Sequence, residues 1–411
     1  MSEMMAFSFA PHAVANSQGF IRQTEERPAA PQPIATSALG SQSSLVQPSH
    51  VTCAAALAVG LSTAVVGKGR RRRNRACSKR GSTTRVARAE SQQQTALVDY
   101  DSESVLELAK KANVKLEVKP WEFLSGIAKD ASRGWFVKRA EERGIKWTEL
   151  VQEEEASQEH LNRLYEEVNN PNLEYPDYYT KPFHGYDEGN LNWKAAHELV
   201  PATQSMCLSY YDGLSWEEAQ EKFRANARNT FQTEWQKRHG DAQPQNLLDM
   251  GCSCGFSTAE MAKVFPGAKA TGLDLSPYFL ATAKRQYPEI DFVHRLAEET
   301  NFDAESYDAI TINFLLHEVP LETSKRIIAE CERLLKPGGM LAILDVDPRR
   351  LLELPPMRRW AFQVTEPWCK DGEYYSLKLS EELGKVGFEG ITTAKNDPVN
   401  AIAVAFKPAD A

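Results

Sequence analysis

The feature that most constrains the fold is a short apolar run that leads through a glycine-rich turn into a helical pattern. Residues 246–250 form the apolar run, residues 251–255 read Gly-Cys-Ser-Cys-Gly, and residues 256–264 have the helical pattern. Glycine lets the backbone turn sharply and approach a ligand without an intervening side chain, and the start of a helix offers free N–H donors. The sequence therefore predicts a strand, a ligand-binding turn and a helix of an α/β sheet.

A second apolar run, at residues 269–275, brings an acidic residue to the same region. Asp274 lies nineteen residues beyond Gly255, at the carboxyl end of this run, where a carboxylate can accept hydrogen bonds from both hydroxyls of a ribose. Nicotinamide nucleotides use the same geometry, so the two runs leave a dehydrogenase open. The turn, however, reads Asp-x-Gly-Cys-x-x-Gly rather than Gly-x-Gly-x-x-Gly. With no pyrophosphate to bind, Asp249 can face a cationic cofactor instead.

The rest of the chain continues the alternation of strands and helices. In order, the expected elements are a strand at 307–316, a helix at 321–335 that ends at 336–339, a strand at 340–346, and a closing strand pair at 388–393 and 401–406. The Lys-Pro-Gly-Gly sequence at 336–339 is typical of a helix terminator. The closing pair predicts an antiparallel edge, which dehydrogenase folds lack.

Several segments of the chain carry a family resemblance. They are LLDMGCSCGFST, KATGLDLSPYFL, FVHRLAEET, SYDAITINFLLHEVP, RLLKPGGMLAILDVDP and TEPW…EYY, with ASRGWFVKRAEERGI and YYTKPFHGYDEGNLNW upstream. Together they resemble class I S-adenosylmethionine-dependent methyltransferases, and in particular methyltransferase-like proteins of cyanobacteria and plastids. The resemblance implies an α/β fold with a Rossmann-like sheet and an antiparallel closing strand, preceded by a mainly helical accessory region. It also implies S-adenosyl-L-methionine as the cofactor.

The resemblance further assigns residues to that cofactor. It implies that Gly251, Ser253 and Gly255 line the methionine and ribose, that Asp274 holds the ribose hydroxyls, that Leu275, Ala297 and Glu298 enclose the adenine, and that Asp249 and Asn313 complete the set. Many relatives have an Asp directly before the Ala-Glu pair to bind the adenine amino group, whereas this chain has Leu296. Adenine recognition then falls to the backbone or to Glu298.

Two residues at the end of the fourth strand are candidates for catalysis. Methyl transfer from a sulfonium is an in-line displacement, so the enzyme mainly aligns the reactants and excludes water. A hydroxyl or an activated ring carbon must also lose a proton, and His317 or Glu318 is placed to accept it. A carboxylate or a tertiary amine acceptor needs no base, and a histidine that is merely hydrogen-bonded at a strand end explains His317 equally well.

Two further segments are candidates for binding the acceptor. Residues 173–198 are crowded with aromatic side chains, among them Tyr179, His184 and Tyr186, and form either a lid over the site or a docking seam. Trp368 and Tyr374 lie in the connection that leaves the carboxyl edge of the fifth strand. They are suited to an apolar or aromatic acceptor, although core packing explains them as well. The expected acceptor is a small organic molecule of aromatic, quinone-like or isoprenoid type.

Charge divides the chain into a basic leader and an acidic body. Residues 1–89 contain twelve Lys or Arg and three acidic residues, a net charge of +9; the whole chain carries −8, so the remainder carries −17. An acidic body disfavours duplex nucleic acid as a partner and favours a small molecule.

The leader has the composition of a targeting segment. Residues 27–89 contain no Asp or Glu and are rich in Ser, Thr, Ala and Arg, which resembles plastid presequences. The apolar stretch at 53–66 is shorter than the roughly 20 residues of a membrane-spanning helix. We therefore expect a plastid protein, soluble or peripheral, without a transmembrane span in its mature form. A disordered basic arm for nucleic acid or an acidic membrane is the alternative.

The expected domain organisation has four parts. These are a presequence at 1–89, a helical accessory region at 90–170, a helical cap or lid region at 171–240 and the methyltransferase domain at 241–411. Trp121, Trp135, Phe136 and Trp147 are expected to anchor the packing of the accessory region. The seven cysteines show no C-x-x-C spacing, so no metal site is expected. The alternative function is a binding protein that keeps the fold without catalysis.

Overall fold

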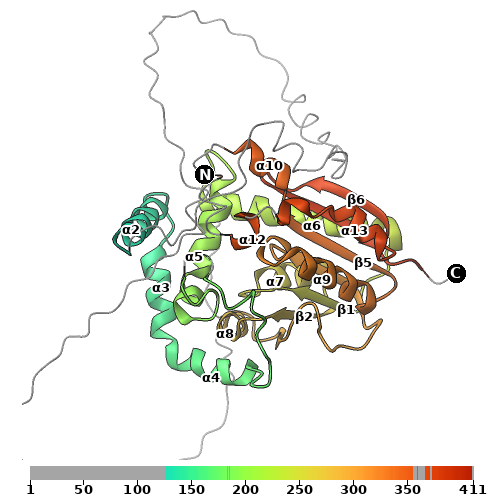
Figure 1. The fold of residues 1–411 in the computed structure, drawn as a ribbon, viewed down its shortest axis with the longest axis horizontal. Coiled ribbons are helices and arrows are strands. Elements are labelled where there is room, and N and C mark those ends of the chain that lie inside the picture. Colours follow the sequence, from blue (N-terminus) through green and yellow to red (C-terminus); the bar gives the residue numbers. More distant parts are fainter. Residues whose placement is uncertain are drawn as a thin grey trace, which may run out of the picture. The chain divides into compact units, whose positions relative to one another are not determined.

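Seven strands of the described residues join into one sheet at the centre of the fold (Figure 1). The structure is a computed structural model that describes residues 126–182, 184, 186–354, 359, 366–370 and 373–409. The predicted presequence at 1–89, the beginning of the accessory region and Trp121 lie outside the described residues.

The strands follow the order β3-β2-β1-β4-β5-β7-β6. Neighbours from β3 to β5 are parallel, and β7 runs antiparallel to both β5 and β6. The strands are β1 (Asn246–Met250), β2 (Lys269–Asp274), β3 (Asp291–His294), β4 (Tyr307–Asn313), β5 (Leu335–Val346), β6 (Glu389–Lys395) and β7 (Asn400–Phe406). The prediction of an α/β sheet with an antiparallel closing edge is confirmed.

Helices connect the strands and precede the sheet. They are α2 (Gly126–Glu142), α3 (Trp147–Ala156), α4 (Gln158–Val168), α5 (Trp193–Ser209), α6 (Trp216–His239), α7 (Phe256–Val264), α8 (Pro277–Gln286), α9 (Leu321–Leu334), α10 (Pro348–Glu353), α12 (Pro367–Lys370) and α13 (Leu379–Lys385), with short 3-10 turns at Leu316–Glu318 and Tyr374–Ser376. Helices α3 and α6 contact α5, whereas α4 and α5 contact α8. The helical region before the sheet is therefore packed against the domain.

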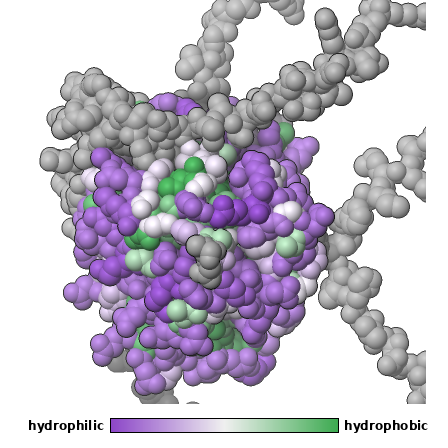
Figure 2. Space-filling view, turned by 90° about the vertical axis from the view of Figure 1, so that its right-hand side faces the viewer, coloured by the Kyte–Doolittle hydropathy of each residue, from purple (hydrophilic) through white to green (hydrophobic). Residues whose placement is uncertain are grey.

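The alternation of side chains along the strands produces two core layers. Leu248 of β1 belongs to a cluster with residues of α9 and α13, while its neighbour Leu247 belongs to a second cluster with residues of α6 and α7. Because successive strand residues face opposite sides of a sheet, the apolar run at 246–250 buries both faces at once. The face shown in Figure 2 is correspondingly mostly hydrophilic, with separate small hydrophobic patches.

Two predicted boundaries were wrong at the junction of α9 and β5. The segment 336–339, predicted as a helix terminator, lies inside β5, which begins at Leu335 rather than at residue 340. Leu335 pairs with Tyr307 of β4, so the chain enters the sheet directly after the last residue of α9. The strand predicted at 307–316 ends instead at Asn313, and Phe314 follows with a φ of +58°.

The prediction for the packing anchors was partly wrong. Phe136 and Trp147 are buried, and their rings meet edge to face with centroids 5.3 Å apart. Trp135 is 41% exposed, because neighbouring helical residues point about 100° apart and Phe136 takes the inward direction. None of the described helices is long and apolar enough to cross a membrane.

Candidate active site

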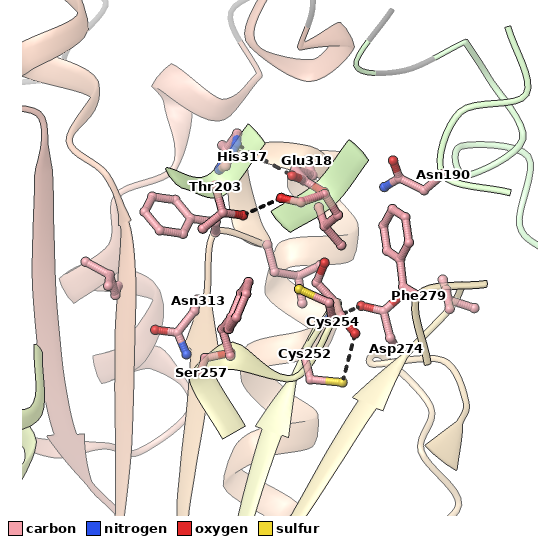
Figure 3. Close-up of a pocket in the computed structure, with 18 of the residues that line it drawn as sticks. Asn190, Thr203, Cys252, Cys254, Ser257, Asp274, Phe279, Asn313, His317 and Glu318 are labelled. Carbon is pink, nitrogen blue, oxygen red and sulfur yellow. Dashed lines mark hydrogen bonds and ion pairs between the residues drawn. The ribbon is translucent and has the colours of Figure 1, made fainter. Parts of the chain in front are cut away.

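A cavity of about 340 Å³ lies at the carboxyl ends of β1, β2 and β4 (Figure 3), and residues of α5 and α6 also line it. Thirteen of the predicted site residues line it: Gly251, Ser253, Asp274, Leu275, Ala297, Glu298, Asn313, His317, Glu318, Tyr179, His184, Tyr186 and Trp368. The glycine turn, the acidic residue at the end of β2 and the residues after β4 are thus brought together, although up to 67 positions separate them in the chain.

Three predicted residues do not line this cavity. Asp249 is fully buried behind its wall, where it accepts hydrogen bonds from Ser257 and Asn313 and from two threonine hydroxyls. Gly255 starts α7, and a Cβ atom there would lie 2.7 Å from the Phe292 ring, so this glycine permits packing. The Tyr374 hydroxyl donates to the Val346 carbonyl at 2.5 Å, behind His317. These three residues therefore support the cavity wall through packing and hydrogen bonds and do not contact the cavity.

The glycine turn forms a narrow part of the cavity wall. Gly251 has a φ of +72°, and a Cβ atom at this position would come within 3.2 Å of the Leu315 side chain. Any side chain here would fill the space between the turn and the residues after β4. The backbone of Gly251 is therefore exposed to the cavity with no side chain in between, which allows a ligand to approach it closely.

Asp274 is fixed with its carboxylate at the cavity. The backbone N–H groups of Ser253 and Ser276 donate to its Oδ2 and Oδ1, each at 2.8 Å. Burial raises the pKa of Asp274 to about 6 against these two hydrogen bonds, and the charges of Glu318 and Asp249 add to the rise. Each carboxylate oxygen has a second acceptor position, so the pair of oxygens suits the two hydroxyls of a ribose.

Glu298 offers an unused acceptor at the same end. Its Oε1 accepts from the Tyr178 hydroxyl at 2.8 Å, while its Oε2 is buried and has no hydrogen-bond partner among the described residues. Leaving a buried acceptor unpaired costs about 1–3 kcal/mol, and an adenine amino group would satisfy it. The residues present thus fit S-adenosylmethionine despite Leu296, with Asp274 for the ribose and Glu298 for the adenine.

A cation that the sequence did not predict also lies at the cavity. Arg224 of α6 lines the cavity, with its guanidinium 4.4 Å from the centre of the Phe256 ring and Nη1 3.8 Å from Oε1 of Glu260. Guanidinium groups bind carboxylates through two parallel hydrogen bonds, so Arg224 can hold the carboxylate of the cofactor. The sequence gives no signal for this role, since α6 contains many charged residues.

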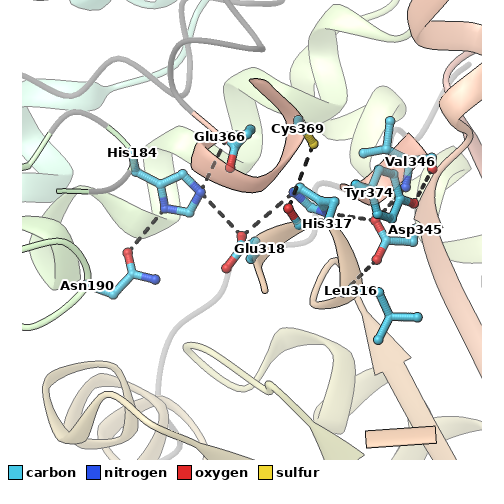
Figure 4. Close-up of polar contacts among 10 residues, drawn as sticks. All are labelled: His184, Asn190, Leu316, His317, Glu318, Asp345, Val346, Glu366, Cys369 and Tyr374. Atoms are coloured by element: carbon cyan, nitrogen blue, oxygen red, sulfur yellow. Dashed lines mark hydrogen bonds and ion pairs between the residues drawn. The ribbon is translucent and has the colours of Figure 1, made fainter. Parts of the chain in front are cut away.

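A cluster of histidines and carboxylates also faces this cavity, through His184, His317, Glu318 and Glu366 (Figure 4). Oε1 of Glu318 lies 3.3 Å from Nε2 of His184 and 3.9 Å from Nε2 of His317. Nδ1 of His317 lies 2.6 Å from Oδ1 of Asp345, and Nε2 of His184 lies 3.6 Å from Oε1 of Glu366. Asp345 and Glu366 were not predicted as site residues. Their only signals in the sequence are that Asp345 follows the apolar run of β5 and that Glu366 lies within the TEPW segment.

The carboxylates control the charge of both histidines. Burial alone lowers the pKa of His184, but the charges of Glu366 and Glu318 and the hydrogen bonds to Glu318 and Asn190 outweigh it and raise the pKa to about 9. Burial also lowers the pKa of His317. The charge and hydrogen bond of Asp345 outweigh this effect, together with the charges of Glu318 and Glu366, and raise the pKa to about 9. Both imidazoles therefore carry two protons at neutral pH. No group of three or more His, Cys, Asp or Glu in the described part of the chain is arranged to hold a metal ion.

Comparison with known proteins finds a methyltransferase domain in this chain. Residues 247–339 match the family model of a methyltransferase domain. The chain is 39% identical over 106 residues to the demethylmenaquinone methyltransferase of Chlorobaculum tepidum, covering 26% of this chain and 42% of that protein. It is 36% identical over 147 residues to an uncharacterized methyltransferase of Synechocystis, covering 35% of this chain and 66% of that protein.

Solved structures of the same kind also match. One is a plantazolicin methyltransferase in complex with a substrate analogue and S-adenosylhomocysteine, at 17% identity and a TM-score of 0.38, covering 50% of this chain and 96% of that one. The chain spans less than two thirds of the length of the curated relatives described above. The family match, those relatives and the sheet topology together identify a class I S-adenosylmethionine-dependent methyltransferase domain in this chain, similar to those of cyanobacterial and other bacterial proteins.

Proposed function

We propose that this chain transfers a methyl group from S-adenosylmethionine to a small organic acceptor of aromatic, quinone-like or isoprenoid type. The observation that carries the proposal is a single cavity that joins the bare turn at Gly251 and the carboxylate of Asp274 to the cluster around Glu318. One end fits the methyl donor, and the other end offers groups that can orient an acceptor and take a proton from it.

The acceptor end combines an apolar wall with polar groups. Its apolar wall is formed by Leu199, Ala202 and Met206 of α5, Phe223 of α6 and Phe314 after β4. Near Glu366, Nε1 of Trp368 is buried without a hydrogen-bond partner among the described residues, so it can donate to an oxygen of the acceptor. An apolar body with a polar head matches this wall, and the acceptor named for the Chlorobaculum relative is of this kind.

Catalysis follows from alignment. The sulfonium of the bound cofactor supplies an electrophilic methyl group. Asp274 and Glu298 would hold the nucleoside part and Arg224 the carboxylate, while residues of α5 and of the segment before it line the cavity. Holding the acceptor in line with the methyl group converts a bimolecular reaction into an effectively unimolecular one, which accounts for much of the rate enhancement of such enzymes.

Two measurements test this function. Calorimetric titration of the full chain with S-adenosylmethionine and S-adenosylhomocysteine should show binding of both. Incubation with a panel of hydroquinones under reducing conditions should then yield a product heavier by one methylene group. Absence of binding would refute the function, whereas binding without turnover of any acceptor would favour the alternative, a methyltransferase-like binding protein.

We further propose that the protein acts in the plastid. The proposal is supported by the composition of residues 27–89, which lack acidic residues and contain the basic run at 68–75. A fluorescent protein fused behind residues 1–89 should be imported by isolated plastids and shortened in the process. A fusion that stays outside, uncleaved, would contradict this location.

A further inference from the structure

We propose that Glu318 takes a proton from the acceptor, and that His184 and His317 are positioning residues that hold Glu318 from two sides. The inference rests on the proposed function and narrows it, because it requires an acceptor that loses a proton during methyl transfer. The acceptor is then a hydroxyl, an amine N–H or an activated ring carbon, and neither a carboxylate nor a tertiary amine.

The first argument is the position of Glu318 between two imidazoles. Both contacts, 3.3 Å to Nε2 of His184 and 3.9 Å to Nε2 of His317, go to the same oxygen, Oε1. No hydrogen bond to Oε2 is present among the described residues, so this oxygen keeps its lone pairs for a proton. Glu318 therefore has one oxygen to anchor it and one to accept a proton.

The second argument is that each imidazole is itself held from behind. Oδ1 of Asp345 lies 2.6 Å from Nδ1 of His317 and accepts from the Val346 N–H, while Oδ2 accepts from the Leu316 N–H at 2.9 Å. Nδ1 of His184 lies 3.2 Å from Oδ1 of Asn190. These contacts aim both Nε2 atoms at Glu318, as in Figure 4, and such outer contacts fix the orientation of catalytic groups.

The third argument is protonation and access. With their pKa values near 9, His184 and His317 have no nitrogen lone pair to accept a proton at neutral pH. The side chains of His317, Asp345 and Glu366 are 4–6% exposed, whereas that of Glu318 is 21% exposed. Glu318 is thus the accessible carboxylate of the cluster.

The step balances without a further reactant. A lone pair of the acceptor oxygen or nitrogen, or the π pair of an activated ring carbon, forms the new bond to the methyl carbon, and the C–S bond breaks with its electrons going to sulfur. The electron pair of the O–H, N–H or C–H bond stays on the acceptor. The proton moves to Oε2 of Glu318 and then to solvent. The products are the methylated acceptor, S-adenosylhomocysteine and one proton.

An acceptor-free experiment tests the positioning. The full chain labelled with ¹⁵N-histidine contains eight histidines, and His184→Gln and His317→Gln variants assign the two signals. Glu318→Gln should lower the pKa of both histidines together, whereas Asp345→Asn should mainly lower that of His317 and Glu366→Gln mainly that of His184. The matched control Glu322→Gln, an exposed carboxylate of α9 paired with Lys325, should leave both unchanged. A Glu318→Gln variant in which either histidine titrates as in the wild type overturns the two-sided arrangement.

A turnover experiment tests the proton transfer. With 1,4-naphthohydroquinone as probe, or whichever hydroquinone of the panel gives the fastest product formation, Glu318→Gln should lower kcat by about 10²–10⁴-fold, with unchanged affinity for S-adenosylmethionine, and Glu322→Gln should match the wild type. The wild-type rate should be level at neutral pH and fall above about pH 9, where the histidines lose their protons. A rate that instead rises up to pH 9 would make His317 the base and overturn the assignment. If the wild type does not bind S-adenosylmethionine by calorimetry, the proposed function itself is refuted, and this measurement is separate from the turnover experiment.

Discussion

At Gly251 the backbone combines a φ of +72° with a space that a Cβ atom would fill, 3.2 Å from Leu315. We expect Gly251→Ala to abolish binding of S-adenosylmethionine by calorimetry. Gly267 separates the two effects, because it has a φ of +96° and no atom within 4 Å of its Cβ position. Gly267→Ala should cost about 1 kcal/mol of stability through backbone strain and bind the cofactor normally. Equal affinities in the two variants would contradict the close approach at residue 251.

Asp274 predicts a pH dependence of cofactor binding. Its pKa is raised to about 6, so the carboxylate is ionised above that pH and protonated below it. Only the ionised form offers both oxygens as strong acceptors, so the affinity for S-adenosylhomocysteine should be constant above pH 7 and fall below pH 6. This product carries no sulfonium, and its use isolates the ribose contact.

The matched variants for this prediction are Asp274→Asn and Asp291→Asn. The first should bind at least about tenfold more weakly at pH 7, equivalent to the loss of one charge-assisted hydrogen bond, and lack the acid limb. The second changes a half-exposed residue of β3 paired with Lys269 and should behave as the wild type. If the affinity of Asp274→Asn for S-adenosylhomocysteine still falls below pH 6, the titrating group is not Asp274.

Among the elements, the segment between α4 and α5 depends on one buried histidine. Nδ1 of His294 in β3 accepts from the Asn170 N–H at 3.0 Å, and its Nε2 lies 3.0 Å from the Leu275 carbonyl. Burial lowers the pKa of His294, and the contact with Leu275 only partly opposes this. Its stabilising contribution is therefore present above pH 6.5 and lost as the pH falls through the lowered value.

We expect His294→Ala to loosen this segment. Removing the acceptor leaves the Asn170 N–H unpaired, at a cost of about 1–3 kcal/mol, so amide hydrogen exchange at residues 169–182 should accelerate at pH 7. His160→Ala, in the exposed part of α4, is the matched control. Unchanged exchange in His294→Ala would show that the aromatic contacts of Tyr175 and Tyr178 hold the segment without it.

The contacts of this segment could not be predicted from the sequence, in contrast to the bounds of a helix. Helix α7 begins and ends at the predicted residues, because apolar spacing is a local signal. The contacts of Tyr178 with Glu298 and of Asn170 with His294 join residues 120 and 124 positions apart, and no local pattern encodes such a pairing. Asp345 and Arg224 were missed for the same reason, since their significance comes from what the fold places beside them.

The chain as a whole should lose stability on the alkaline side through its histidine cluster. For His184 and His317 the folded-state pKa is about 9 against 6.5 for the ordinary side chain. A raised folded-state pKa contributes stability that is fully present below pH 6.5 and is lost as the pH rises through 9. The buried cysteines, whose pKa values burial raises above 9, stay neutral in the folded state across this window.

The melting temperature of the full chain should therefore fall between pH 6.5 and 9, and Glu318→Gln should flatten that fall because it removes a charge that both histidines share. Glu322→Gln should keep the wild-type slope, since its carboxylate lies on the exposed side of α9. A Glu318→Gln slope as steep as that of the wild type would mean that the histidines are held by Asp345 and Glu366 alone. The pH dependence of unfolding thus tests, without cofactor or acceptor, whether the catalytic end of the cavity is one electrostatic unit.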